Sequence, residues 1–202
     1  LLCQRDGQLS LLAQTLQVEP RIVSFLLEAD GRASYLPAYL TMEKPQVTSD
    51  ELAFAPDLMS QVESLSHAPS PLWVHLQGQE WMALQCARAL CAAWGTRLLR
   101  IDAGTADTKQ EVVRDRAEVA RRESRLAGAA LYIDLDPTDE RGESARPTAH
   151  DILAPWLELF REHPHPIFWR MSSPLPLGQK GLYPNIVRIT FGPPAYAQRL
   201  AH

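Results

Sequence analysis

The stretch that decides the fold is LWVHLQGQEWMAL, residues 72–84. Its first five residues form a short apolar run, which predicts a β-strand. Residues 81–94 then repeat apolar side chains at helical spacing and stop at Gly95, which predicts a helix of about four turns. A strand that passes through a short glycine-containing turn into a helix is the first half of a βαβ unit. The chain downstream should therefore alternate strands and helices.

The downstream sequence continues this alternation. Further strands are predicted at 97–101, 129–133, 166–171 and 186–191, and helices at 108–126 and up to His163, with Pro155 kinking the last helix or delaying its start. Strands joined through helices need crossover connections, so the sheet should be largely parallel with helices on both faces. We therefore predict an α/β, three-layer fold built on a five-stranded, mainly parallel sheet.

The upstream sequence has a different pattern. Residues 9–40 carry apolar side chains at helical spacing, and Pro20 suits the first turn of a helix. We predict a helical N-terminal segment over 1–45, a linker with a short helix near 57–66 over 46–70, and the α/β core over 71–202. The chain begins without an initiator Met, and we expect it to be a piece of a longer protein.

Composition narrows the functional class. Of the 202 residues, 46% are hydrophobic and 22% are charged, which is typical of a packed globular domain. The net charge of −4 gives no electrostatic footprint for DNA or an anionic membrane, and no apolar run is long enough for a membrane span. The three cysteines lack metal-ligand spacing, so we expect buried free thiols in a cytoplasmic protein.

The turn after the first predicted strand is where the chemistry should lie, because parallel sheets bind ligands beyond the carboxyl ends of their strands. A phosphate-binding loop there needs GxxxxGK[ST]. Alignment by the following helix places Ala83 at the Lys position and Leu84 at the Ser/Thr position. Glu80 adds a negative charge where phosphate would sit, and Trp81 is bulky. We hypothesise that the Trp81 ring fills the space of the absent phosphate.

The end of the third predicted strand carries a second incomplete motif. An apolar run ends in Asp134, where such an aspartate would hold Mg²⁺, but the next residue is Leu135 instead of a water-activating Glu. Asp134 is also open to interpretation as a cap of a turn at the strand end. We interpret Asp136 as a poor acid–base partner for Asp134. We predict no catalytic residue and no metal ligand, and assign Gly78 and Asp134 as vestigial cofactor-binding residues.

With both incomplete motifs in view, the chain resembles the AAA+ ATPases. It is similar in particular to the degenerate N-terminal ATPase module of bacterial AAA+ proteins that carry a second, intact module, among them those associated with contractile injection systems. The resemblance rests on residues 9–27, on 121–134, and on 187–194 with Arg199. The chain ends near where the helical lid of such a module would begin. Neither a sensor residue near Met171 nor an arginine finger is evident.

The resemblance implies a three-layer P-loop NTPase-like core whose function is non-hydrolytic. The expected role is that of a scaffold, oligomerisation or partner-docking module within a larger ATPase, with other AAA+ modules or subunits as partners. The resemblance implies no cofactor for this domain, and ATP with magnesium for the parent protein. The first alternative is a regulatory module that binds ATP weakly.

Other signals point to different functions. Residues 12–28 fit a helix-turn-helix DNA-binding adaptor, but the second helix would expose only a weakly basic face. His163 and His165 lie in a His-Pro-His-Pro run, which we interpret as a solvated loop because no Cys or acid completes a metal shell. Asp102 follows the second strand as a ribose-binding acid would, but the required GxGxxG is missing.

Overall fold

The computed structural model describes residues 2–4, 16–18, 20–27, 36–46, 60, 64–65, 72–102, 110–135, 156–171 and 186–192. The chain divides into two compact units, Leu1–Pro37 and Ala38–His202. Asp136, the predicted kink at Pro155 and Arg199 lie outside the described residues.

The first unit contains a two-stranded antiparallel sheet and a short helix. Strand β1 (Leu2–Gln4) pairs with β2 (Leu16–Val18), and helix α1 (Pro20–Leu26) follows. The helix confirms the expected role of Pro20 in a first turn. The prediction that residues 16–18 are helical is wrong, because this three-residue run pairs with β1 instead. A helix-turn-helix would need helix at this position, so the described part of the unit does not support that motif.

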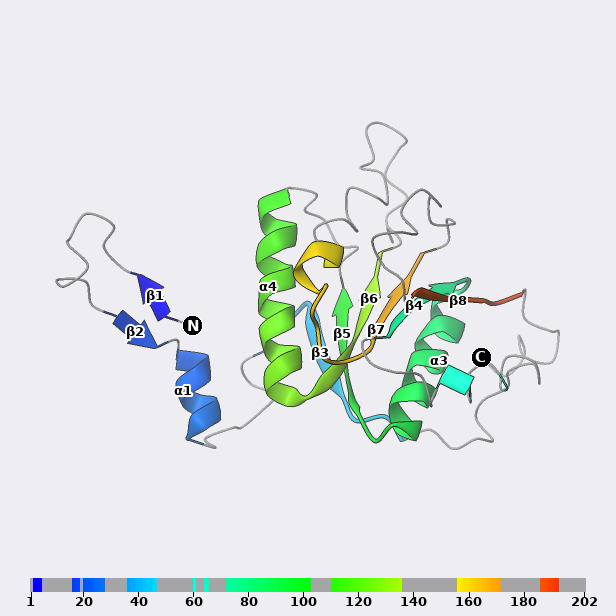
Figure 1. Cartoon of the computed structure of the whole chain (residues 1–202), viewed down its shortest axis with the longest axis horizontal. Helices are drawn as coiled ribbons and strands as arrows, with labels where there is room; N and C mark the ends of the chain where they lie inside the picture. Colours follow the sequence, from blue (N-terminus) through cyan, green and yellow to red (C-terminus); the bar gives the residue numbers. More distant parts are fainter. Residues whose placement is uncertain are drawn as a thin grey trace. The chain divides into compact units, whose positions relative to one another are not determined.

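The second unit is built on a six-stranded sheet in the order β3-β5-β6-β7-β4-β8 (Figure 1). The bounds are β3 (Leu40–Glu43), β4 (Trp73–Gln77), β5 (Arg97–Asp102), β6 (Ala129–Asp134), β7 (Ile167–Arg170) and β8 (Ile186–Thr190). All neighbouring pairs are parallel except β3 with β5, so the mainly parallel sheet is confirmed. Strand β4 is enclosed by β7 and β8. The chain therefore runs from β4 across the sheet to β5, returns through β6 and β7, and passes β4 to reach β8.

This reversal places helices on opposite faces of the sheet (Figure 1), because crossover connections share one hand. Helix α3 (Glu80–Ala93) packs on the face formed by alternate residues such as Leu76, Leu98, Tyr132 and Phe168. Helix α4 (Gln110–Ala127) lies against β5 and β6, with Ala117 and Ala120 fully buried. Every residue of β6 is buried, as expected for a strand covered on both faces.

Two expectations about the second unit need correction. The sequence predicted five strands and a helical segment up to residue 45, but Leu40–Glu43 forms β3 and joins the sheet edge antiparallel to β5. The unit boundary accordingly falls at residue 37 instead of 45. The predicted strands at 97–101, 129–133 and 186–191 match β5, β6 and β8 to within a residue.

The His-Pro-His-Pro run is also placed differently from the prediction. His163 is only 3% exposed, and its Nε2 lies 2.9 Å from the Ser124 hydroxyl of α4. Ser124 in turn donates to the carbonyl of Ala129. The solvated-loop interpretation is therefore wrong for His163, because the ring fills the core between α4 and the residues that precede β7.

Candidate functional site

The loop between β4 and α3 occupies the position of the predicted phosphate-binding loop. Its backbone turns at Gly78, where φ is +145°, a conformation that side-chain-bearing residues rarely adopt. The Phe191 N–H donates to the Gln77 carbonyl at 2.8 Å. A Cβ atom on Gly78 would lie 2.9 Å from the Cβ of Phe191, so the glycine is required by close packing as well as by its φ angle.

The positions that would grip a nucleotide point into the core. Ala83 is fully buried, Leu84 is 7% exposed, and Met82 is 6% exposed. All three belong to the same core cluster beneath α3 as Leu76 and Tyr132. A Lys or Ser/Thr side chain starting from these positions would have to cross packed apolar side chains to reach the loop. The residues present therefore do not fit a bound Mg·nucleotide.

The first turn of α3 is held by side chains of its own loop and of β5. Gln79 is the N-cap residue, but it makes no side-chain cap, and its Oε1 instead accepts a hydrogen bond from Trp81 Nε1 at 2.7 Å. Glu80 accepts a hydrogen bond from Arg100 Nη2 at 2.9 Å. Trp81 packs against the edge of the core cluster while remaining partly exposed. The charge that was predicted to repel phosphate is thus compensated within the domain.

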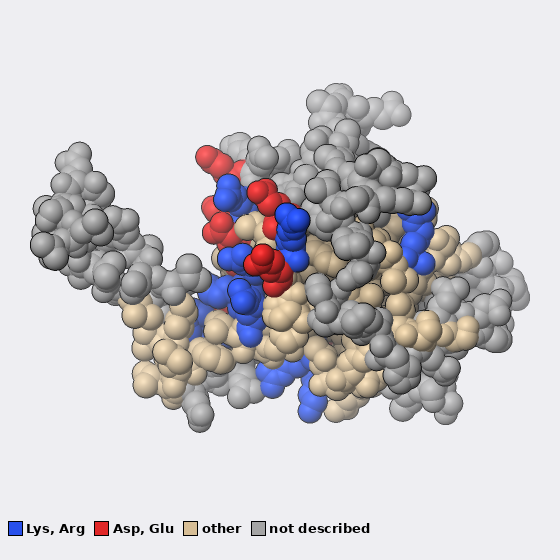
Figure 2. Space-filling view, in the orientation of Figure 1, with Lys and Arg blue, Asp and Glu red and all other residues tan. Residues whose placement is uncertain are grey.

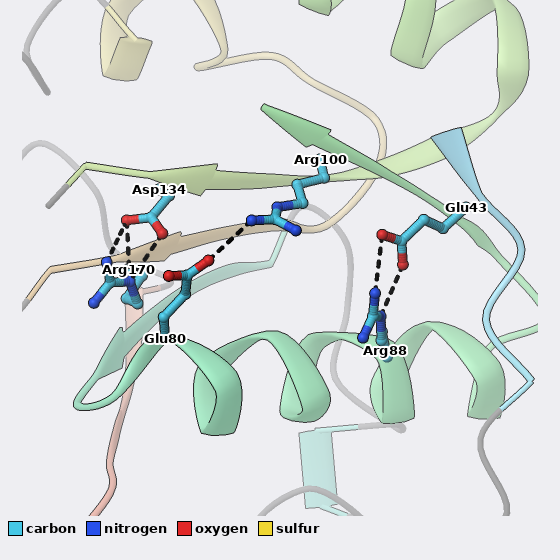
Figure 3. A network of polar contacts seen from close by, with 6 residues as sticks. All are labelled: Glu43, Glu80, Arg88, Arg100, Asp134 and Arg170. Atoms are coloured by element: carbon cyan, nitrogen blue, oxygen red, sulfur yellow. Dashed lines mark hydrogen bonds and ion pairs between the residues drawn. The ribbon is translucent and has the colours of Figure 1, made fainter. Parts of the chain in front are cut away.

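Asp134 lies at the carboxyl end of β6, and a side chain from the next strand holds it (Figure 3). Arg170 of β7 places Nη2 2.8 Å from Oδ1 and Nε 3.0 and 3.1 Å from the two carboxylate oxygens. Both side chains are 9% exposed. The two residues are partners in the parallel register, so the pairing of β6 with β7 brings them together. Sequence reasoning did not foresee this role for Asp134.

Tyr132 lies between these charged pairs on the α3 face of β6. Its ring is fully buried, and burial is the main cause that raises the pKa of its hydroxyl group. Asp134 and Glu80 raise the pKa further, whereas Arg170 and Arg100 lower it. The phenol therefore stays protonated and neutral.

A third acid–arginine pair lies on the same face of the sheet. Arg88 of α3 donates from Nε and Nη2 to the two carboxylate oxygens of Glu43 on β3, at 2.8 and 3.0 Å. Figure 3 shows this pair together with the Glu80–Arg100 and Asp134–Arg170 pairs. We call these six residues the ion-pair row. It fastens α3 to β5 at its start and to β3 in its middle, and it joins β6 to β7.

The sequence carried one signal for the ion-pair row. Arg170 ends a strand of four buried residues, and a buried guanidinium requires an acidic partner nearby. The sequence does not say which acid this is, because only the folded sheet shows that β6, which ends in Asp134, is the neighbour of β7. Arg100 and Glu43 gave no such signal, because an arginine in the middle of β5 and an acid on an unpredicted strand both look solvent-exposed.

The other candidate residues are exposed. Asp102 ends β5 beside Asp134, its partner in the parallel register of β5 and β6, and Arg188 is exposed on β8. Among the described residues, no group of three His, Cys, Asp or Glu side chains could hold a metal ion. Acidic and basic side chains are interspersed over the region of α4 in Figure 2, which is not the single-sign surface that DNA requires. No helix in the described part of the chain is long and apolar enough to cross a membrane.

The order of the strands, the helices on both faces and the loop at the end of β4 together define a P-loop NTPase-like α/β fold. Among solved structures, the chain is similar to the crystal structure of the FIGL-1 AAA domain in complex with ADP, with a TM-score of 0.56. The sequence identity is 12%, and the match covers 93% of this chain and 66% of that chain. The fold is therefore similar to that of an AAA domain. No protein-family model matches the sequence, and no curated protein matches it.

Proposed function

We propose that this domain is a non-hydrolytic AAA+-like module of a larger ATPase, in which it acts as a scaffold that other AAA+ modules or subunits pack against. The observation that carries the proposal is the Asp134–Arg170 pair. In an active site of this fold, the carboxylate at the end of this strand would help to hold Mg²⁺. Here a guanidinium group bound to both carboxylate oxygens already supplies the compensating charge.

The burial of Ala83 and Leu84 supports the same proposal. A charge-assisted hydrogen bond contributes about 1.5–3 kcal/mol, so the missing Lys contact alone weakens nucleotide binding by about one to two orders of magnitude. The missing hydroxyl and the Glu80 carboxylate act in the same direction. The ion-pair row also anchors α3 to β5 and β3, which suits a part that keeps its shape while neighbouring modules move.

The proposal is tested by isothermal titration calorimetry of Mg·ATP into the full 202-residue chain. We expect a dissociation constant in the millimolar range or no measurable heat. Sedimentation velocity with and without Mg·ATP should give the same distribution of oligomers. Binding with a micromolar constant, or assembly that depends on nucleotide, would show that the domain is not a passive scaffold.

A second candidate is a regulatory module that binds ATP weakly. It is favoured by the retained Gly78 turn and by the helix start that lacks a side-chain cap, because the first amides of a helix attract anions. The variant Arg100→Met separates the two candidates. Arg100 pairs with Glu80 in the first turn of α3, so its removal leaves the Glu80 carboxylate without this partner and should weaken nucleotide binding at a regulatory site, whereas a scaffold has no nucleotide affinity to change.

A further inference from the structure

The loop between β4 and α3 is joined to the end of β8 by two kinds of contact. Strand β8 pairs with β4 up to Gln77 and Thr190, and the hydrogen bond from the Phe191 N–H to the Gln77 carbonyl extends this pairing by one residue. The next loop residue, Gly78, then passes close to the Phe191 side chain. A Cβ atom on Gly78 would lie 2.9 Å from Phe191 Cβ and 3.2 Å from Phe191 Cδ2.

Phe191 is also part of the core that supports the first turn of α3. It is 6% exposed and belongs to the cluster that contains Met82 and Leu84. Its ring therefore contacts a core that supports α3, and its backbone and Cβ lie against the loop that leads into this helix. One residue at the end of β8 thus determines both the path of the loop and the support of the helix start.

We propose that Phe191 is a positioning residue that holds the β4–α3 loop against the end of β8, so that the position of the start of α3 depends on the position of β8. In an enzyme of this fold a bound anion would order the loop, whereas here an internal contact does so. The position of Glu80, and with it the Glu80–Arg100 pair, then follows the position of Phe191. This inference does not depend on whether the domain binds nucleotide.

The first test is hydrogen–deuterium exchange of the Phe191→Ala and Phe191→Leu variants. Removing the ring should raise the exchange rates of amides 77–84 by about tenfold or more, because local opening no longer breaks the Phe191 contact. Amides 110–127 of α4 serve as the internal reference and should keep their rates. Leucine, which refills most of the space, should restore most of the protection. An equal rise in both segments, or no rise in the loop, would overturn the proposal.

If Phe191→Ala is poorly folded, the comparison of Phe191→Leu with the native chain carries the first test. The second test is a double-mutant cycle read from urea unfolding. Gly78→Ala is destabilised by two causes, the strained φ angle and the clash with the Phe191 Cβ atom. Gly128→Ala is destabilised only by its φ angle of +60°, because nothing lies within 4 Å of that Cβ position. Removing the opposing Cβ with Phe191→Gly should reduce the effect of Gly78→Ala on the folding constant by about fivefold or more. The effect of Gly128→Ala should not change. Additive behaviour of both pairs would show that Phe191 does not constrain the loop.

Discussion

The buried imidazole of His163 should make the stability of the domain depend on pH. Ser124 donates its hydroxyl proton to the Ala129 carbonyl, so it accepts a hydrogen bond from His163 Nε2–H. Nδ1 is buried without a hydrogen-bond partner among the described residues. Burial, together with charge repulsion from His165, Arg125 and Arg121, lowers the pKa of His163 from 6.5 to about 3. The ring is therefore neutral in the folded protein at neutral pH.

The size of the effect follows from these two pKa values. Between pH 6.5 and 3 the unfolded chain binds a proton at His163 that the folded chain does not bind, so stability is complete above pH 6.5 and is lost as the pH falls. Between pH 7 and pH 5 this one group should lower the free energy of unfolding by about 2 kcal/mol. His165, whose pKa is also lowered by burial, adds a smaller loss of the same sign.

Urea unfolding at pH 7 and pH 5, followed by circular dichroism, measures this loss. The neutral variant His163→Gln should be less stable than the native chain at pH 7, but it should lose about 2 kcal/mol less on going to pH 5. His165→Gln is the matched control, and most of the native pH dependence should remain in it. If the native chain and His163→Gln lose the same free energy between the two pH values, the buried neutral imidazole is not the cause.

Three further predictions concern the α3 face. Ala83→Lys restores the lysine of a phosphate-binding loop at a fully buried position. It should lower the free energy of unfolding by about 3 kcal/mol or more, measured by urea unfolding. It should not create Mg·ATP binding, which calorimetry measures. Arg170→Met should lower the free energy of unfolding by about 3 kcal/mol, because it leaves the Asp134 carboxylate buried without its guanidinium; a loss below about 1 kcal/mol would contradict the importance of the pair. Arg88→Met should cost only about 1 kcal/mol, because that pair is partly exposed, and exchange should rise in β3 but not in β6.

The parallel part of the fold could be predicted because the hydrophobic pattern of each strand lies within a short stretch of sequence. Residues 129–133 are an uninterrupted apolar run, and residues 72–76 are apolar except for His75, as expected for strands that are buried on both faces. Helix α3 could also be predicted, because Gly95, with a φ angle of +61°, ends it as expected. These elements depend on period and on stop signals, which are visible within a single window of sequence.

Strand β3 could not be predicted because its formation depends on a distant partner. Leu40–Glu43 is four residues long and lies between Pro37 and Pro45, which is typical of a connector. It becomes a strand because the edge of β5 offers unpaired backbone groups some 60 residues further along the chain. The same reason applies to β2, whose partner is β1.

The loss of the phosphate-binding residues could be predicted from the sequence. The Asp134–Arg170 pair that takes the place of a metal ion could not. The substitutions at Ala83 and Leu84 are visible in the sequence, and the structure places both residues in the core. The burial of His163 was missed because prolines on both sides are typical of exposed loops. The Arg170 contact was missed because a side-chain pairing between two strands requires their register, which only the folded sheet supplies.

The guanidinium at the end of β7 differs from a metal ion in one respect that matters in a cell. A metal ion dissociates when its concentration falls, and an ammonium group loses its proton at high pH, but an arginine is covalently tethered and remains charged at any physiological pH. The carboxylate of Asp134 therefore has a counter-ion whose supply does not vary with the magnesium or nucleotide content of its surroundings. In the proposed scaffold role, the conformation of this domain would not respond to the concentration of Mg·ATP. The domain would therefore offer neighbouring subunits the same surface before, during and after each of their catalytic cycles.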